Sequence, residues 1–141
     1  MTHHTIYRQQ LEPLISKAVE LGASDAAIIS SKDIQVRNDL AKLCNGEYTC
    51  PNWGQAASCP PHVGGPQVFR EWQSESIFSI AVKIELPTSV MFSEDRHEVM
   101  KHLHNIVARL EQEAAKLGLN RSKAFAGGSC KTLFCPDQAE C

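Results

Sequence analysis

Six cysteines carry most of the chemistry that the sequence offers, and they form two groups of three. The first group is spaced x5 and x8 and the second x4 and x5, the members being Cys44, Cys50 and Cys59, then Cys130, Cys135 and Cys141. Clustered thiolates are ligands for metal ions and iron–sulfur clusters. Neither group has the C-x2-C pairs of zinc ribbons or the C-x2-C-x2-C run of bacterial ferredoxins. The spacing therefore predicts a metal site and leaves the metal open.

The residues around the cysteines favour iron and sulfur over a bare zinc ion. Proline follows three of the cysteines, in Cys50-Pro51, Cys59-Pro60-Pro61 and Cys135-Pro136. Proline fixes the backbone and removes a donor, which holds the neighbouring thiolate in place, and a ferredoxin ligand run also ends in Cys-Pro. Large rings lie beside the predicted ligands and would screen a cluster from water, namely Tyr48, Trp53 and Phe134.

The number of ligands limits the kinds of site. Four thiolates complete one [4Fe–4S] cluster or one tetrahedral zinc site, so six thiolates serve either one site that draws on both groups or two sites that each lack a ligand. His62, which follows Cys59-Pro60-Pro61, is the candidate for a further ligand. A lone histidine in a loop is more often exposed or hydrogen-bonded. Cys141 is the last residue, and a ligand there leads us to expect that the natural protein continues further.

Length and charge exclude several classes of protein. The chain has 141 residues, about the length of one domain, and its 14 basic and 16 acidic residues give a net charge of −2. Because there is no basic excess, nucleic acid is not the expected partner. No aliphatic stretch approaches the ~18 residues of a membrane span, and the amino terminus lacks a secretory pattern. We therefore expect a cytoplasmic protein, whose reduced thiols serve a metal instead of disulfides.

Hydrophobic periodicity predicts alternating helices and strands. Apolar residues at helical spacing predict a helix from about Glu12 to Leu21, a short helix from Pro66 to Trp72 and a long helix from about Ser93 to Leu117. Gly22 and Gly118 follow two of these helices, as expected for C-terminal caps. Short apolar or alternating runs predict strands at 26–30, Ile34–Val36, Ile77–Leu86 and Lys123–Ala126. This order indicates an α/β fold: a single domain over residues 1–141, with a central sheet of about three to five strands, flanking helices and two cysteine-rich loops at one end.

Other polar residues suggest no catalytic site. His97, His102 and His104 lie in the predicted long helix, and we interpret them as part of a solvated face. The sequence has no HExxH zinc motif, no phosphate-binding glycine loop and no G-x-S-x-G elbow. The two cysteine groups are therefore the candidate functional residues.

The two loops together resemble a known family. The motifs are Cys44-x5-Cys50-Pro-Asn-Trp-Gly-x4-Cys59-Pro-Pro and, later, Phe125-Ala-Gly-Gly-Ser-Cys130-x4-Cys135-Pro-x4-Cys141. From about residue 36 to the carboxyl end, the chain is similar to the prokaryotic predicted metal-binding proteins grouped as domain of unknown function 2284. The resemblance implies that all six cysteines are metal or iron–sulfur ligands in a small α/β protein. By this resemblance, members usually continue past the position of Cys141 with another cysteine, so the number of ligands in the second group stays open and a further segment is an expectation.

Three functional hypotheses follow. The leading one is a cytoplasmic protein that holds one or two [4Fe–4S] clusters and transfers electrons to a redox protein partner or senses redox state, without being an enzyme. The second is a zinc-stabilised structural or interaction module. The third is an enzyme in which a cluster iron with an open coordination position acts as a Lewis acid. The sequence is also compatible with a homo-oligomer.

Overall fold

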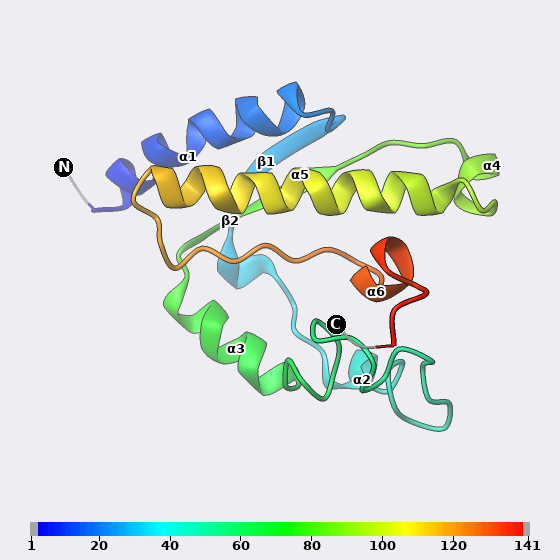
Figure 1. Cartoon of the computed structure of the whole chain (residues 1–141). Helices are drawn as coiled ribbons and strands as arrows, with labels where there is room; N and C mark the ends of the chain where they lie inside the picture. Colours follow the sequence, from blue (N-terminus) through cyan, green and yellow to red (C-terminus); the bar gives the residue numbers. More distant parts are fainter. Residues whose placement is uncertain (1–2, 140–141) are drawn as a thin grey trace. The chain divides into compact units, whose positions relative to one another are not determined.

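The computed structural model describes the backbone of residues 3–139 and the side chains of residues 8–139 (Figure 1). The chain divides into two compact units. Unit 1 consists of Met1–Ile29 and Phe78–Gly127, and unit 2 consists of Ser30–Ile77 and Gly128–Cys141. Each unit is therefore built from two segments that are separated along the chain.

Unit 1 is formed by two long helices and a two-stranded antiparallel sheet. Its elements are α1 (His3–Glu20), β1 (Asp25–Ser30), whose last residue crosses into unit 2, β2 (Phe78–Lys83), α4 (Thr88–Met91) and α5 (Arg96–Lys116). The backbone N–H of Ser24 donates to the Lys83 carbonyl at 2.8 Å, next to the paired strands β1 and β2. Helix α1 packs against α5, and both helices contact β2.

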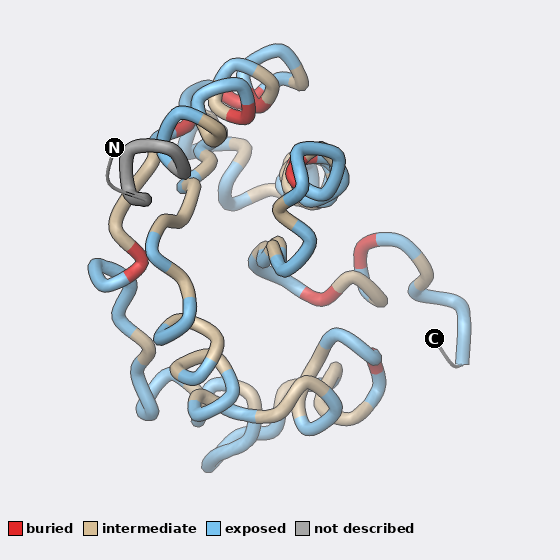
Figure 2. The backbone as a smooth tube through the Cα atoms, turned by 90° about the vertical axis from the view of Figure 1, so that its left-hand side faces the viewer, coloured by how far each residue is buried: buried red, intermediate tan, exposed pale blue. Residues whose placement is uncertain are grey.

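The hydrophobic core of unit 1 lies between these elements. On α5 the buried residues Ile106, Leu110 and Ala114 are four positions apart, so they share one face of the helix. Leu14 and Ala18 of α1 belong to the same core, and Figure 2 marks the buried positions in red. Ala18 of α1 is 0% exposed and Ala114 of α5 is 4% exposed. Because alanine side chains are small, they allow the two helices to approach closely.

Both long helices end in the way that the sequence predicts. Gly22 and Gly118 have φ values of +113° and +86°, a conformation that glycine adopts without steric cost. The Ala23 N–H donates to the Ala18 carbonyl at 3.0 Å, and the Leu119 N–H donates to the Ala114 carbonyl at 2.9 Å. These bonds are those of a Schellman motif, which satisfies carbonyls at the end of a helix.

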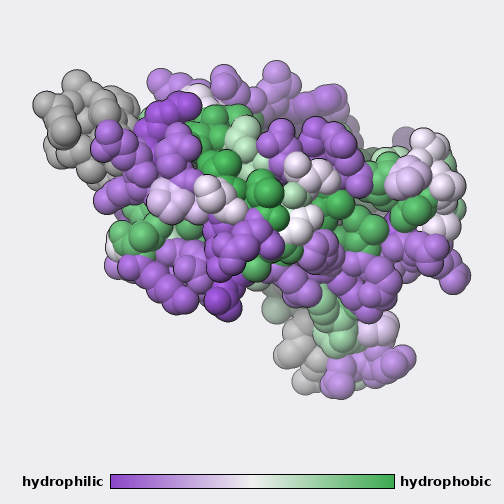
Figure 3. Space-filling model, turned by 90° about the horizontal axis from the view of Figure 1, so that it is seen from above, coloured by the Kyte–Doolittle hydropathy of each residue, from purple (hydrophilic) through white to green (hydrophobic). Residues whose placement is uncertain are grey.

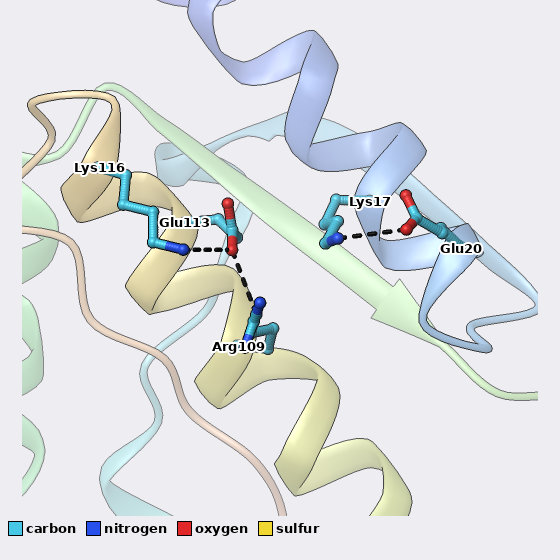
Figure 4. A network of polar contacts seen from close by, with 5 residues as sticks. All are labelled: Lys17, Glu20, Arg109, Glu113 and Lys116. Atoms are coloured by element: carbon cyan, nitrogen blue, oxygen red, sulfur yellow. Dashed lines mark hydrogen bonds and ion pairs between the residues drawn. The ribbon is translucent and has the colours of Figure 1, made fainter.

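Lys17, Arg109 and Lys116 set the electrostatic environment of Glu113 in unit 1 (Figure 4). The Glu113 carboxylate accepts hydrogen bonds from Lys116 Nζ at 3.0 Å and from Arg109 Nε at 3.2 Å. The hydrogen bond from Lys116 lowers the pKa of Glu113, burial opposes this, and the charges of Lys116, Arg109 and Lys17 add to the lowering. The charged form of Glu113 is therefore favoured in the folded protein.

Replacing this carboxylate should change how stability depends on pH. Because folding lowers the pKa of Glu113, its stabilising contribution is present above the unfolded pKa and is lost as the pH falls through the folded pKa. We expect Glu113→Gln to be less stable than the wild type at neutral pH by a small amount, and the difference to vanish in acid. Urea denaturation from pH 7 to pH 3 measures this. In a Lys116→Met background, the stability difference caused by Glu113→Gln should depend less on pH. A stability difference between Glu113→Gln and the wild type that is independent of pH would contradict the prediction.

Unit 2 contains only short helices and long loops in its described part. The elements are η1 (Ser31–Asp33), α2 (Asn38–Ala41), α3 (Pro66–Glu75) and α6 (Cys130–Phe134). Helix α3 begins at Pro66, as predicted, because proline at the first helical position gives up no hydrogen bond. Helix α3 contacts η1. The loop between α2 and α3 carries the first cysteine group.

Unit 2 has almost no hydrophobic core. Among the described residues, only Ala56 and Leu133 are buried hydrophobic residues of this unit. Larger apolar side chains stay in solvent, with Leu43 71% exposed and Tyr48 70% exposed. Exposed apolar residues also occur in unit 1, where Phe92 is 80% exposed, and Figure 3 shows hydrophobic surface interspersed with hydrophilic surface. Small units with so little buried apolar surface are commonly stabilised by additional means, such as disulfides or bound metals.

The predicted central sheet of about three to five strands is wrong, because the described residues form one sheet of two strands. Residues Ile34–Val36 are not a strand, since side chains of α3 take their carbonyls: Gln73 Nε2 donates to the Ile34 carbonyl at 2.6 Å and Arg70 Nη2 to the Val36 carbonyl at 3.0 Å. Residues 123–126 are not a strand either, and the Ala124 N–H donates to Glu111 Oε2 at 2.9 Å. Side chains thus form hydrogen bonds with backbone carbonyl and N–H groups that would pair with another strand in a sheet.

The helices agree better with the sequence. The long helix is confirmed as Arg96–Lys116. The first helix is longer than predicted: it begins at His3, and Pro13 lies in its interior. The short helices α2, α4 and α6 were not predicted, since a run of four or five residues has too little periodicity to detect. No helix in the described part of the chain combines the length and the hydropathy needed to cross a bilayer.

Candidate metal centre

The five described cysteines all lie in unit 2, and none of them forms a disulfide. Each thiol is free and half-buried, the residues being Cys44, Cys50, Cys59, Cys130 and Cys135. The sixth predicted ligand, Cys141, lies outside the described residues. Sulfur donors that are unpaired and partly shielded from water suit a thiolate-bound metal or cluster.

A tight turn brings Cys44 and Cys50 together along the first loop. The Cys50 N–H donates to the Cys44 carbonyl at 2.9 Å, and Asn45 and Thr49 form an isolated antiparallel bridge between them. The Thr49 hydroxyl also donates to Asn45 Oδ1 at 3.1 Å. The first two members of this cysteine group are thus neighbours through the backbone and not only through the sequence.

One ion pair precedes this turn. Arg37 Nε donates to Asp39 Oδ1 at 3.0 Å, at the start of α2. The hydrogen bond from Arg37 lowers the pKa of Asp39, although burial opposes the shift. The Asp39 carboxylate is therefore held in its charged form beside Arg37.

The segment around Cys59 folds back on the same loop. The Cys59 N–H donates to the Ala56 carbonyl at 3.0 Å, and the Gly54 N–H donates to the Pro60 carbonyl at 2.8 Å. His62 is exposed, and its Nε2 lies 3.0 Å from the Gly54 carbonyl. Because a carbonyl only accepts, Nε2 carries the hydrogen, and a neutral His62 has only Nδ1 available to bind a metal.

The two cysteine loops meet through a crossed pair of serine–cysteine contacts. Ser58 Oγ of the first loop lies 2.8 Å from Cys130 Sγ of the second. The Cys59 thiol donates to Ser129 Oγ at 3.5 Å. A third contact joins the loops, in which the Thr132 hydroxyl donates to Asn52 Oδ1 at 3.0 Å. One predicted ligand from each group is therefore held against the other loop.

Within the described residues, no group of three or more histidine, cysteine, aspartate or glutamate side chains lies in an arrangement that could hold a metal ion. Within this described part of the chain, the loops come together at Cys59 and Cys130 without forming a full set of ligands. Among the helix α5 histidines, His102 is exposed, while His104 is half-buried with Nε2 2.8 Å from the Gly127 carbonyl. Of the predicted screening rings, Trp53 is half-buried, whereas Tyr48 and Phe134 are exposed.

The serines in these contacts were missed from the sequence. Ser58 precedes Cys59 and Ser129 precedes Cys130, so the dipeptide Ser-Cys occurs once in each loop. This repetition was the available signal. It could not be interpreted without knowing that the loops meet, because serine is common in loops for other reasons.

A comparison with protein families agrees with the sequence motifs and the free thiols. Residues 27–141 match the model of the family described as predicted metal-binding protein, domain of unknown function 2284. No curated protein and no solved structure gives a significant match to the chain. The matched region includes all six cysteines and most of the chain. The chain therefore belongs to this family of predicted metal-binding proteins.

Proposed function

We propose that unit 2 holds a [4Fe–4S] cluster through cysteine thiolates from both loops and serves electron transfer or redox sensing in the cytoplasm. The observation that carries the proposal is the meeting of Cys59 and Cys130 with serines of the opposite loop, which draws on both cysteine groups at one place. One site that uses both groups also satisfies the ligand count, because four of the six thiols complete a cluster.

The exposure of the thiols suits a redox centre. All five described cysteines are half-buried, so a cluster on them would be shielded by protein on one side and close to the surface on the other. Hydrogen bonds and solvent exposure set the potential of an iron–sulfur cluster. The bound cluster supplies a one-electron redox couple. A redox protein is the partner that such a centre needs.

The residues of the chain would hold and position this group. Cysteine thiols lose their protons when they bind metal, so the sulfurs would act as thiolates. The Cys-Pro steps restrict the backbone beside Cys50, Cys59 and Cys135. Because the described cysteines do not form a complete ligand set, binding would draw them together and order unit 2 at the same time.

A zinc-stabilised module is the second candidate, and the small core of unit 2 favours it. Only Ala56 and Leu133 are buried hydrophobic residues in the described part of that unit. Zinc bound by thiolates supplies folding energy in small domains that lack a core. Zinc would require the same cysteines, so the two candidates differ in the metal and in its redox activity.

Metal analysis of anaerobically purified protein separates the candidates. The proposal expects iron and acid-labile sulfide in equal amounts, four of each per cluster, with broad visible absorption that bleaches on reduction. Zinc without sulfide in a colourless protein would contradict the iron–sulfur proposal and support the zinc-stabilised module. Protein purified without oxygen that contains neither iron nor zinc would contradict both candidates. A Cys59→Ala, Cys130→Ala double variant is the matched control and should lose the metal.

A further inference from the structure

We propose that Ser129 and Ser58 are positioning residues of the metal centre, each hydroxyl donating a hydrogen bond to a metal-bound thiolate of the opposite loop. This inference rests on the proposed function, and it adds two residues that are not ligands. Ser129 would donate to the Cys59 thiolate, and Ser58 would donate to the Cys130 thiolate.

The first observation is the geometry of the crossed contacts. Ser58 Oγ lies 2.8 Å from Cys130 Sγ, and Cys59 Sγ lies 3.5 Å from Ser129 Oγ. Ser58 directly precedes Cys59 in the sequence and contacts Cys130. Ser129 directly precedes Cys130 and contacts Cys59. The two contacts are therefore reciprocal, and each one ties a candidate ligand to the other segment of unit 2.

The second observation is that Ser129 does not cap a helix. It occupies the residue before α6, where a serine oxygen commonly accepts a hydrogen bond from the first turn. No such bond is formed by the Ser129 side chain. The hydroxyl faces the Cys59 sulfur instead, at 3.5 Å. The side chain thus gives up a common local role and makes a contact with a predicted ligand.

Metal binding reverses the direction of the contact between Cys59 and Ser129. In the metal-free thiol, the Cys59 S–H donates to the Ser129 oxygen. When the thiol binds metal, its proton is released to solvent and the sulfur can only accept. The Ser129 O–H then rotates to donate to the thiolate, and the sulfur atom keeps its partner. Hydrogen bonds to ligand sulfurs stabilise the bound state and orient the ligand.

The two serines should differ in importance because their exposure differs. Ser129 is only 9% exposed, so water cannot readily replace its hydroxyl. Ser58 is exposed, and a water molecule can take over its contact with Cys130. We therefore expect the larger effect at Ser129 and a smaller effect of the same sign at Ser58.

A matched pair of variants tests the hydroxyl of Ser129. Threonine and valine have nearly the same shape, but only threonine carries a hydroxyl, so Ser129→Thr and Ser129→Val differ in the hydrogen bond alone. The full-length protein is purified without oxygen, and the release of its own metal to excess EDTA is followed over time. We expect Ser129→Val to release metal about 10-fold faster or more than Ser129→Thr, as is typical when a partner of a metal ligand is lost. Ser58→Val and Ser58→Thr should differ less.

Controls separate this inference from a general loss of folding. Ser76 is a half-buried serine of unit 2 whose hydroxyl donates to the Trp72 carbonyl at 3.1 Å, so Ser76→Ala should not change the release rate. Equal release rates for Ser129→Thr and Ser129→Val, with metal bound in the wild type, would overturn the inference and leave the proposed function standing. A wild type purified without metal would overturn both. If Ser129→Val alone arrives without metal while Ser129→Thr retains it, the inference is supported.

Discussion

Removing the metal is expected to unfold unit 2 while unit 1 keeps its structure. The reason is the unequal distribution of buried apolar residues, since the core cluster around Leu14, Ile106 and Leu110 belongs to unit 1. Structural zinc sites have apparent binding free energies of roughly 10–16 kcal/mol, which exceeds the stability of most small domains. Hydrogen exchange under anaerobic conditions, with and without chelator, should show lost protection across Ser30–Ile77 and retained protection in α5.

Restoring the metal provides the control for this experiment. Protection in unit 2 should return when metal is added back, with sulfide if the metal is iron, because binding and folding of a small metal site are coupled. Protection that stays unchanged in unit 2 after complete removal of the metal would show that the loops fold without it. In that case the small core of unit 2 would have to be sufficient on its own.

Ile106→Ala is expected to destabilise unit 1 by about 2–5 kcal/mol, the usual cost of removing a buried isoleucine side chain. Ile106 is 2% exposed and belongs to the cluster that joins α1 to α5. The cavity that the missing side chain would leave adds to the lost burial. Urea denaturation followed by the helical circular dichroism signal measures the change.

Asn105→Ala is the matched control for Ile106→Ala. Asn105 is exposed and is the neighbouring residue on the same helix. Alanine is a good helix former, so this change should leave the free energy of unfolding within about 0.5 kcal/mol. Equal effects at the two positions would contradict the assignment of the core.

Long periodic segments could be predicted from the sequence, whereas pairings with distant residues could not. The stripe that includes Ile106 and Leu110 identifies α5, and Gly118 marks its end, because these signals are local. The expected strand at Ile34–Val36 failed, since its carbonyls bond to Arg70 and Gln73, more than thirty residues away. Local propensity contains no information about such partners.

The residues of the candidate site show the same difference between local signals and contacts with distant residues. Clustering and the Cys-Pro steps predict the cysteines as ligands, and this assignment stays a prediction, whereas the family match supports metal binding in general. Ser58 and Ser129 were not identified, because their chemistry depends on contacts across the two loops. His62 stays a predicted ligand, and its Nε2 is already engaged by the Gly54 carbonyl.

Thiol alkylation before and after metal removal tests most directly whether both cysteine loops bind the metal. Protein purified without oxygen is treated with iodoacetamide, and each cysteine is quantified by mass spectrometry. We expect cysteines of both loops, Cys59 and Cys130 among them, to be protected while metal is bound and to become alkylated once a chelator removes it. Rapid alkylation of every cysteine in either loop of the metal-loaded protein would contradict it.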